Sequence, residues 1–213
     1  MTTRIPPVDG EAAVDHLRRV EPRFRAVIDH AGPYAPERRP YKSLFEALGR
    51  AIVYQQLNGV AAGTIHARYM NLFAERTPEP KQLLTLSDAK LRGAGLSGAK
   101  TAAVRDLARR IASGELPTLR ELPYLDDDVV LEKLTAVRGV GPWTVHMLLL
   151  FHLRRPDVLP TGDYGVRSGY AALFKKRALP TEKALTLAAK PWRPYRSVAS
   201  WYLWRVKLLG AVC

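Results

Sequence analysis

Apolar residues recur along this chain at the three- and four-residue spacing of amphipathic helices. Val104, Leu107, Ala108 and Ile111 stand at i, i+3, i+4 and i+7, which predicts a helix with one buried face. The same spacing predicts helices over residues 14–28 with a break at Pro22, and over 44–55, 60–75, 80–91, 164–173 and 194–206. No alternating strand pattern exceeds a few residues, so the sequence predicts an all-α fold.

Turn and capping residues predict where these helices begin and end. Ser43 and Glu46 have the spacing of a capping box, and Thr181 is typical of an N-cap. Residues 31–41 are rich in proline and arginine, which indicates a connector between an N-terminal arm and a central lobe. After residue 54, Asn58 and Gly59 are interpreted as the C-cap of the preceding helix.

Residues 126–151 predict two helices joined by a glycine hairpin. Val130, Leu134 and Val137 share one face of the first helix, which must stop at Gly139. We expect Gly139 and Gly141 to form a turn too tight for side chains, and Pro142 to open the second helix. Bare N–H groups at such a helix start are suited to bind one phosphate.

The net charge narrows the choice of partner. A formal charge of +13 and a pI near 10.1 favour a polyanion, either nucleic acid or an acidic membrane surface. The longest apolar run, around residues 147–151, is far shorter than the roughly 20 residues of a spanning helix. The first residues lack the features of a signal peptide, so we expect an intracellular, cytoplasmic protein that does not bind membranes.

The metal-binding residue types are sparse. Cys213 is the single cysteine, which excludes an intramolecular disulfide and a four-cysteine iron–sulfur cluster. The five histidines are scattered, and none pairs with cysteine or aspartate at metal-ligand spacing. We therefore expect no transition-metal cofactor.

A single acid, Asp163, follows a Pro/Gly turn after the second hairpin helix. Taken alone, an aspartate at this place is most simply the N-cap of a helix that starts at Tyr164. The alternative is a carboxylate with a chemical role.

Several stretches together resemble a known family. The segments are LTAVRGVGPWTV followed by LPTGDY, RAIVYQQLNGVAAGTI, GLSGAKTAAVRDLA and PWRPYRSVASWYLWR. In this order they resemble the helix-hairpin-helix DNA glycosylases with a Gly/Pro-rich loop and a catalytic aspartate, and specifically the 3-methyladenine glycosylase II (alkylpurine) branch. The resemblance covers residues 40–205.

The resemblance implies an architecture and a partner. It implies two helical lobes with a cleft between them that holds Asp163. Residues 1–42 would form an N-terminal arm that packs with the C-terminal lobe, 43–150 a central helical barrel lobe with the hairpin, and 151–213 the catalytic loop and C-terminal helices. The expected protein is a monomer that binds double-stranded DNA containing damaged bases.

The resemblance also implies the reaction. Asp163 would be the catalytic carboxylate, which stabilises the oxocarbenium-like sugar formed when a purine leaves. Trp143 stands where strand-nicking relatives carry a lysine that forms a Schiff base, so hydrolysis by water without lyase activity is expected. Trp143, Tyr164 and Trp201 match positions that line the base pocket, although an isolated tryptophan such as Trp143 is more often a core residue. Met147 stands where a tyrosine is expected, which alters the pocket.

The DNA contacts are implied in the same way. Gly139, Gly141, Arg138 and Thr144 belong to the hairpin that would bind DNA, and a monovalent cation on the hairpin carbonyls is known among relatives. Gln56, or alternatively Leu57, aligns with the wedge that fills the gap left by a flipped base. The basic residues Arg50, Lys100, Arg105, Arg138 and Arg167 could contact phosphate.

Three functional hypotheses follow. The first is a monofunctional glycosylase that removes 3-methyladenine and 7-methylguanine by base flipping and so initiates base excision repair. The second is a non-catalytic helix-hairpin-helix module that only binds DNA, and the third is a glycosylase of the same fold for another lesion. An acid beside aromatic rings favours the catalytic hypotheses, because a module that only binds DNA has no use for it.

Overall fold

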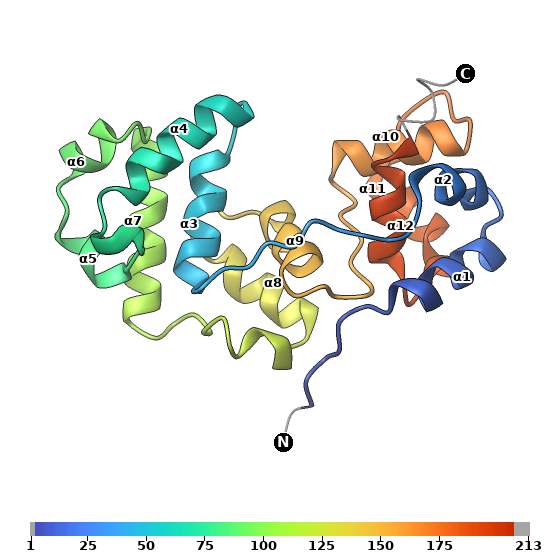
Figure 1. Ribbon diagram of the computed structural model, residues 1–213, viewed down its shortest axis with the longest axis horizontal. Helices are drawn as coiled ribbons and strands as arrows, with labels where there is room; N and C mark the ends of the chain where they lie inside the picture. The colour runs from blue at the N-terminus through green and yellow to red at the C-terminus, as the bar shows by residue number, and fades with distance from the viewer. Residues whose placement is uncertain (1–2, 207–213) are drawn as a thin grey trace. The chain divides into compact units, whose positions relative to one another are not determined.

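A computed structural model of the chain describes residues 3–206, and within that range every regular element is a helix (Figure 1). The prediction of an all-α fold is therefore confirmed. The described residues fall into two compact units, of which unit 1 contains residues 3–4 and 40–148 and unit 2 contains residues 5–39 and 149–206. Cys213 lies outside the described residues.

Unit 1 is built around one long helix, α7 (Gly98–Ala112), which packs against α3 and α5 (Figure 1). Val104, Leu107 and Ala108 on this helix are fully buried, as their spacing predicts. The other elements of the unit are α3 (Leu44–Tyr54), α4 (Gly59–Met70), the 3₁₀ turn η1 (Ala74–Arg76), α5 (Pro80–Thr85), α6 (Asp88–Gly93), the 3₁₀ turn η2 (Leu122–Tyr124), α8 (Asp127–Thr135) and most of α9 (Pro142–Phe151).

Unit 2 has an aromatic core around Trp192, which meets Phe24 edge to face at 5.3 Å between ring centroids. α10 packs against α12, and α12 also contacts α1 and α2. Its elements are α1 (Gly10–Val20), α2 (Phe24–Ala31), α10 (Tyr164–Leu173), α11 (Glu182–Ala188), the 3₁₀ turn η3 (Lys190–Trp192) and α12 (Arg196–Leu203).

The predicted helix starts at Ser43 and Thr181 are confirmed. Ser43 Oγ accepts from the N–H of Glu46 at 3.1 Å, and Thr181 Oγ1 accepts from the N–H of Ala184. The Glu46 carboxylate accepts from the N–H of Lys42 rather than from that of Ser43, so the capping box is displaced by one residue.

Two predicted boundaries are wrong. The helix expected over 60–75 ends at Met70, and the final helix begins at Arg196 rather than at Pro194. Asn58 is not the C-cap of α3. Its side chain accepts from the N–H of Ala61 and so starts α4, because an Asn in extended conformation can serve an N-terminus.

No helix among residues 3–206 is both long and apolar enough to cross a bilayer. The described part of the chain also contains no cluster of three or more His, Cys, Asp or Glu side chains placed to hold a metal ion.

Candidate functional site

The hairpin between α8 and α9 has the predicted form. The N–H of Val137 donates to Leu134 O at 3.2 Å, and the N–H of Val140 donates to Val137 O at 3.0 Å. Gly139 has a φ of +75°, a conformation that glycine adopts without steric cost. Pro142 then opens α9, as predicted.

The two hairpin positions favour glycine for different physical reasons. A Cβ on Gly139 would lie 3.4 Å from the Cβ of Ala103 and would require the left-handed backbone, so Gly139 is demanded by the fold. A Cβ on Gly141 would have no heavy atom within 4 Å. The expectation that Gly141 avoids a clash inside the protein is therefore wrong, and its missing side chain instead leaves the outer face of the hairpin uncovered.

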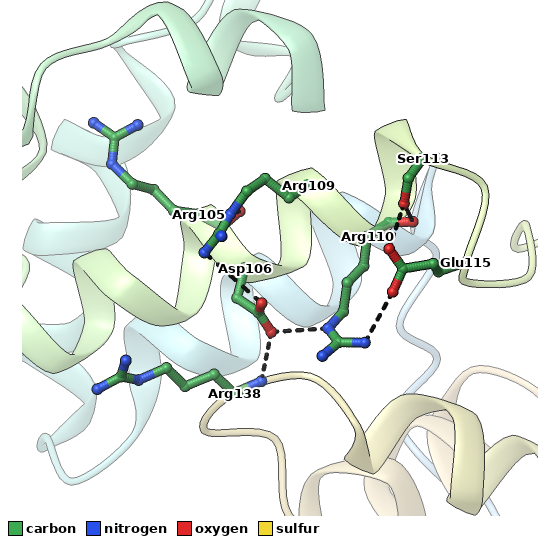
Figure 2. A network of polar contacts seen from close by, with 7 residues as sticks. All are labelled: Arg105, Asp106, Arg109, Arg110, Ser113, Glu115 and Arg138. Carbon is green, nitrogen blue, oxygen red and sulfur yellow. Dashed lines mark hydrogen bonds and ion pairs between the residues drawn. The ribbon is translucent and has the colours of Figure 1, made fainter.

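A carboxylate on α7, that of Asp106, is hydrogen-bonded to the backbone of the hairpin. Asp106 Oδ2 accepts from the backbone N–H of Arg138 at 2.9 Å and from Arg110 Nε at 3.0 Å (Figure 2). Arg110 also bonds Glu115, which extends the network away from the hairpin. Burial acts to raise the pKa of Asp106, but the Arg138 N–H and the Arg110 guanidinium outweigh it and lower that pKa below the ordinary value of 3.8.

Arg138 and Thr144 differ in what they can offer to DNA. Arg138 is exposed, and its side chain extends away from Asp106 (Figure 2). Thr144 is only 6% exposed, and its backbone N–H donates to Gly141 O at 3.0 Å. This burial argues against a DNA contact by the Thr144 side chain, and the backbone bond belongs to the first turn of α9.

Most of the other basic candidates already have partners within the protein. Lys100 Nζ donates to Val53 O at 2.7 Å, and burial lowers its pKa. Arg105 pairs with Asp88, and Arg167 Nε donates to Pro180 O. The guanidinium of Arg50 lies 4.0 Å from the centroid of the Tyr54 ring. These contacts indicate structural roles, which sequence alone could not distinguish from phosphate binding.

The loop between α3 and α4 carries the candidate wedge. Gln56 is exposed and has a φ of +55°, a left-handed conformation that is uncommon outside glycine. Leu57, which follows Gln56, is 37% exposed, and Val60 on the first turn of α4 is 84% exposed. Residues in such conformations cluster at functional sites, which is consistent with a wedge at this loop.

Trp143 lies on the first turn of α9 and is 52% exposed. The alternative that it is an ordinary core residue is therefore wrong. Met147, one turn later on the same helix, is half-buried.

Asp163 is the N-cap of α10, and its carboxylate is held firmly. Its Oδ1 atom accepts from the N–H of Val166 at 2.7 Å and from Trp204 Nε1 at 2.8 Å. The Trp204 ring in turn stacks on Phe151, with centroids 5.8 Å apart. The capping alternative is thus correct as geometry, yet an ordinary cap does not require an indole donor.

Two glycines on α10 make this arrangement possible. A Cβ on Gly165 would lie 2.6 Å from Trp204 Cδ1 and 3.0 Å from Asp163 Oδ1. A Cβ on Gly169 would collide with the backbone of Leu203. Sequence reasoning missed this role, although two glycines four residues apart on one helix signal a close helix–helix contact.

The two aromatic residues of unit 2 that were predicted to line the base pocket differ in their exposure to solvent. Tyr164 is 65% exposed, whereas Trp201 is only 4% exposed. The guanidinium carbon of Arg205 lies 3.2 Å from the centroid of the Trp201 ring, and Tyr34 meets that ring edge-on. These contacts contradict an open face on Trp201, and the tryptophan that contacts Asp163 is Trp204.

Comparison with known proteins identifies the family of the chain. Residues 50–194 match the model of the HhH-GPD superfamily base excision DNA repair protein family. DNA-3-methyladenine glycosylase 1 of Schizosaccharomyces pombe is 32% identical over 197 residues, which are 92% of this chain and 86% of the relative.

Solved structures of similar proteins have the same fold. The structure of S. pombe 3-methyladenine DNA glycosylase in complex with abasic DNA has a TM-score of 0.81 at 32% identity, and the match covers 91% of this chain and 95% of that one. A DNA-3-methyladenine glycosidase from Bacillus halodurans has a TM-score of 0.84 at 34% identity, with 94% and 91% covered. The helix-hairpin-helix, the glycine–aspartate turn and these similarities lead to one conclusion: the chain belongs to the HhH-GPD superfamily of base excision DNA repair proteins.

Proposed function

We propose that this protein is a monofunctional DNA glycosylase of the alkylpurine branch, which hydrolyses the N-glycosidic bond of 3-methyladenine and 7-methylguanine in duplex DNA. The observation that carries the proposal is the fixed carboxylate of Asp163, whose Oδ1 is held by the Val166 N–H and by Trp204 Nε1. The Val166 bond alone is that of an ordinary N-cap, whereas the second donor on the same oxygen, Trp204 Nε1, fixes the carboxylate as a charge-stabilising role requires. The names of the similar glycosylases support the same substrate class.

The chemistry follows from the charge that develops on the sugar. As the bond between the base nitrogen and the anomeric carbon breaks, the base leaves with the electron pair and the sugar becomes oxocarbenium-like. The Asp163 carboxylate stabilises this positive charge and orients a water, which adds its oxygen to the anomeric carbon and loses a proton to the surrounding solvent. An abasic site remains. Because an alkylated purine is already cationic, it leaves as a neutral base and needs no second acid.

Recognition of the base is assigned to exposed aromatic rings. Trp143 and Tyr164 present large uncovered surfaces, at 52% and 65% exposure. A cationic purine is attracted to the face of such a ring by about 0.5–2 kcal/mol. Met147, which is half-buried one turn after Trp143, stands where a tyrosine is expected from the family resemblance, so it offers the base no ring face.

The remaining contacts concern the duplex. We assign one phosphate to the uncovered N-terminal side of α9 at Gly141, with Arg138 beside it, and the gap left by the flipped base to Gln56 or Leu57. A monovalent cation also fits the hairpin, because Val137 O and Gly139 O each accept one hydrogen bond and a carbonyl has two lone pairs. Such an ion would add positive charge near the phosphate, and no step of the reaction depends on it.

The experiment that tests the function is an excision assay on oligonucleotide duplexes that each carry one defined lesion. Release of 7-methylguanine and 3-methyladenine should exceed release of hypoxanthine and ethenoadenine, since the lesion's charge both attracts the rings and weakens the bond. Faster release of the neutral lesions would contradict the alkylpurine assignment. No release from any lesion would favour the DNA-binding module.

A second assay tests the absence of lyase activity. Trp143 has no amine, so borohydride should trap no covalent protein–DNA adduct, and strand breaks should appear only after alkali. The control is a lysine-dependent glycosylase treated in parallel. An adduct trapped as efficiently as in that control would contradict hydrolysis by water alone.

A further inference from the structure

One side chain directly joins the hairpin to residues 55–58 between α3 and α4, which we call the wedge loop. Gln55 Nε2 donates to the carbonyl oxygen of Gly139 at 2.7 Å, across 84 residues of sequence within unit 1. Gln55 is half-buried and follows the last residue of α3, while the exposed Gln56 comes directly after it. The bond therefore connects the base of the wedge loop to the turn of the hairpin.

The helix α7 holds both of these segments from behind. Lys100, Ala103 and Asp106 are spaced by three residues and so lie along one side of that helix. Lys100 Nζ donates to Val53 O near the end of α3, and the Cβ of Ala103 lies 3.4 Å from the position that a Cβ on Gly139 would take. Asp106 accepts from the N–H of Arg138, as Figure 2 shows. The wedge loop and the hairpin thus both pack on α7, and the Gln55 bond links them to each other. We call this set of contacts the frame.

This frame matters because the two segments meet DNA in different ways. A wedge must enter the base stack, whereas a hairpin amide grips the phosphate backbone, and the spacing between stack and backbone is fixed by the duplex. Gln56 also has a left-handed backbone conformation, which persists only when its surroundings hold it. The anchored Gln55 is the neighbour that holds it on one side.

We propose that Gln55 is a positioning residue which couples the wedge loop to the hairpin, so that wedge insertion at Gln56 and phosphate binding at the hairpin occur in one register. The proposal rests on the proposed base-flipping function. Gln55 acts here through Gln56 and Gly139, and it does not itself need to touch the base.

The test uses a binding reaction in which no chemistry takes place. The probe is a duplex with a tetrahydrofuran abasic analogue and 2-aminopurine opposite it, whose fluorescence rises when the wedge unstacks it. Two variants change Gln55: Gln55→Glu places an acceptor against the Gly139 carbonyl, and Gln55→Met keeps the length of the side chain but lacks a donor. The third variant is Gln56→Ala, and the fourth combines Gln55→Met with Gln56→Ala. Gln82→Met, a half-buried glutamine of α5 in the same unit, is the matched control.

We expect Gln55→Met and Gln56→Ala each to reduce affinity and fluorescence change by roughly tenfold, the effect of one hydrogen bond or one wedge. The double variant should lose about tenfold rather than a hundredfold, because coupled residues are not additive. Gln55→Glu should be at least as impaired, and Gln82→Met should match the wild type. Circular dichroism and the thermal midpoint confirm that each variant is folded.

Multiplicative losses in the double variant would overturn the coupling, as would unchanged fluorescence in both folded Gln55 variants. The outcome is separable from the proposed chemistry. A wild type that unstacks 2-aminopurine but excises no lesion would contradict the glycosylase proposal and leave the coupling testable by the same cycle. A wild type that gives no fluorescence change would overturn the coupling, whatever the excision assay shows.

Discussion

The hairpin at Gly139–Gly141 and the turn at Asp163 are both glycine-containing turns that open a helix, yet they are built in opposite ways. At the hairpin, the supporting side chains Asp106 and Gln55 lie behind the backbone, and a Cβ on Gly141 would meet nothing. At the second turn, the glycine of the following helix, Gly165, is closed over by Trp204, which bonds the aspartate itself. At the hairpin, the space beside Gly141 is open to a group from outside the protein. At the second turn, the space beside Gly165 is filled by Trp204, which fixes the Asp163 side chain.

This difference suggests a division of labour between binding and chemistry. Backbone N–H groups at an uncovered turn can donate to a phosphate in DNA of any sequence, and no particular side chain is needed for this. A carboxylate that stabilises a transition state must be held in place beforehand, because it cannot reorganise while charge develops. The predictions that follow separate these two properties.

The largest effect is expected from Asp163→Asn. Asparagine keeps an N-cap acceptor for Val166 but lacks the negative charge, so single-turnover excision should fall by about a hundredfold to a thousandfold. The matched control is Asp9→Asn, the same change at the N-cap of α1 in the same unit, where Asp9 accepts from the N–H groups of Glu11 and Ala12. A loss of similar size in the control would show that neutralising any N-cap carboxylate of this unit lowers the rate, and that the position of Asp163 is not responsible.

Trp204→Phe should have the next largest effect. Phenylalanine retains a ring beside Phe151 but lacks the Nε1–H that donates to Asp163, a bond to a charged group, so the excision rate should fall about tenfold to a hundredfold. DNA affinity and the thermal midpoint should change little. The comparison variant is Trp201→Phe, which should lower the thermal midpoint because Trp201 is buried, without a selective loss of rate. Equal loss of rate in the two variants would contradict the assignment of Trp204.

The two hairpin glycines should separate stability from binding. Gly139→Ala forces a left-handed alanine and should cost about 1–2 kcal/mol of unfolding free energy, measured with denaturant. Gly141→Ala adds a methyl group that meets no protein atom, so stability should hold while affinity for undamaged duplex falls about fivefold. If Gly141→Ala binds DNA normally, the phosphate does not approach the hairpin there.

The smallest effect concerns pH. The Arg138 N–H and Arg110 lower the pKa of Asp106 below 3.8, so its contribution to stability is fully present above pH 3.8 and is lost as pH falls through the lowered value. Asp106→Asn should therefore flatten the acid limb of the stability curve while it modestly lowers stability at neutral pH. The comparison variant is Glu121→Gln, because hydrogen bonds from Thr118 also lower the pKa of Glu121, and it should flatten the acid limb less than Asp106→Asn since Glu121 is fully exposed to solvent. An acid limb of unchanged steepness in Asp106→Asn would contradict this role.

Much of the fold could be read from the sequence because it depends on local signals. The spacing of Val104, Leu107 and Ala108, the cap at Thr181 and the stop at Gly139 are each decided within a few residues. The misassigned Asn58 shows the limit of such signals, since the same residue can end one helix or begin another.

The candidate site was less accessible to sequence reasoning, because its details depend on contacts between distant segments. The turns at Asp163 and at the hairpin glycines could be predicted from the residues, whereas a chemical role for Asp163 came only from the family resemblance. The burial of Trp201 and the contact of Trp204 with Asp163 required the packing of α12 against α10. The partners of Lys100 and Arg105 required the fold of unit 1. A charged residue looks the same in sequence whether it meets DNA or a carbonyl of its own chain.

The central claim is that chemistry resides at Asp163 and phosphate binding at the hairpin. Single-turnover excision of 7-methylguanine, measured against enzyme concentration, separates the maximal rate from the half-saturating concentration. Asp163→Asn should lower only the maximal rate, and Gly141→Ala should raise only the half-saturating concentration, by about fivefold. If both variants change both quantities to the same extent, binding and chemistry are not divided between these two turns, and the account is wrong.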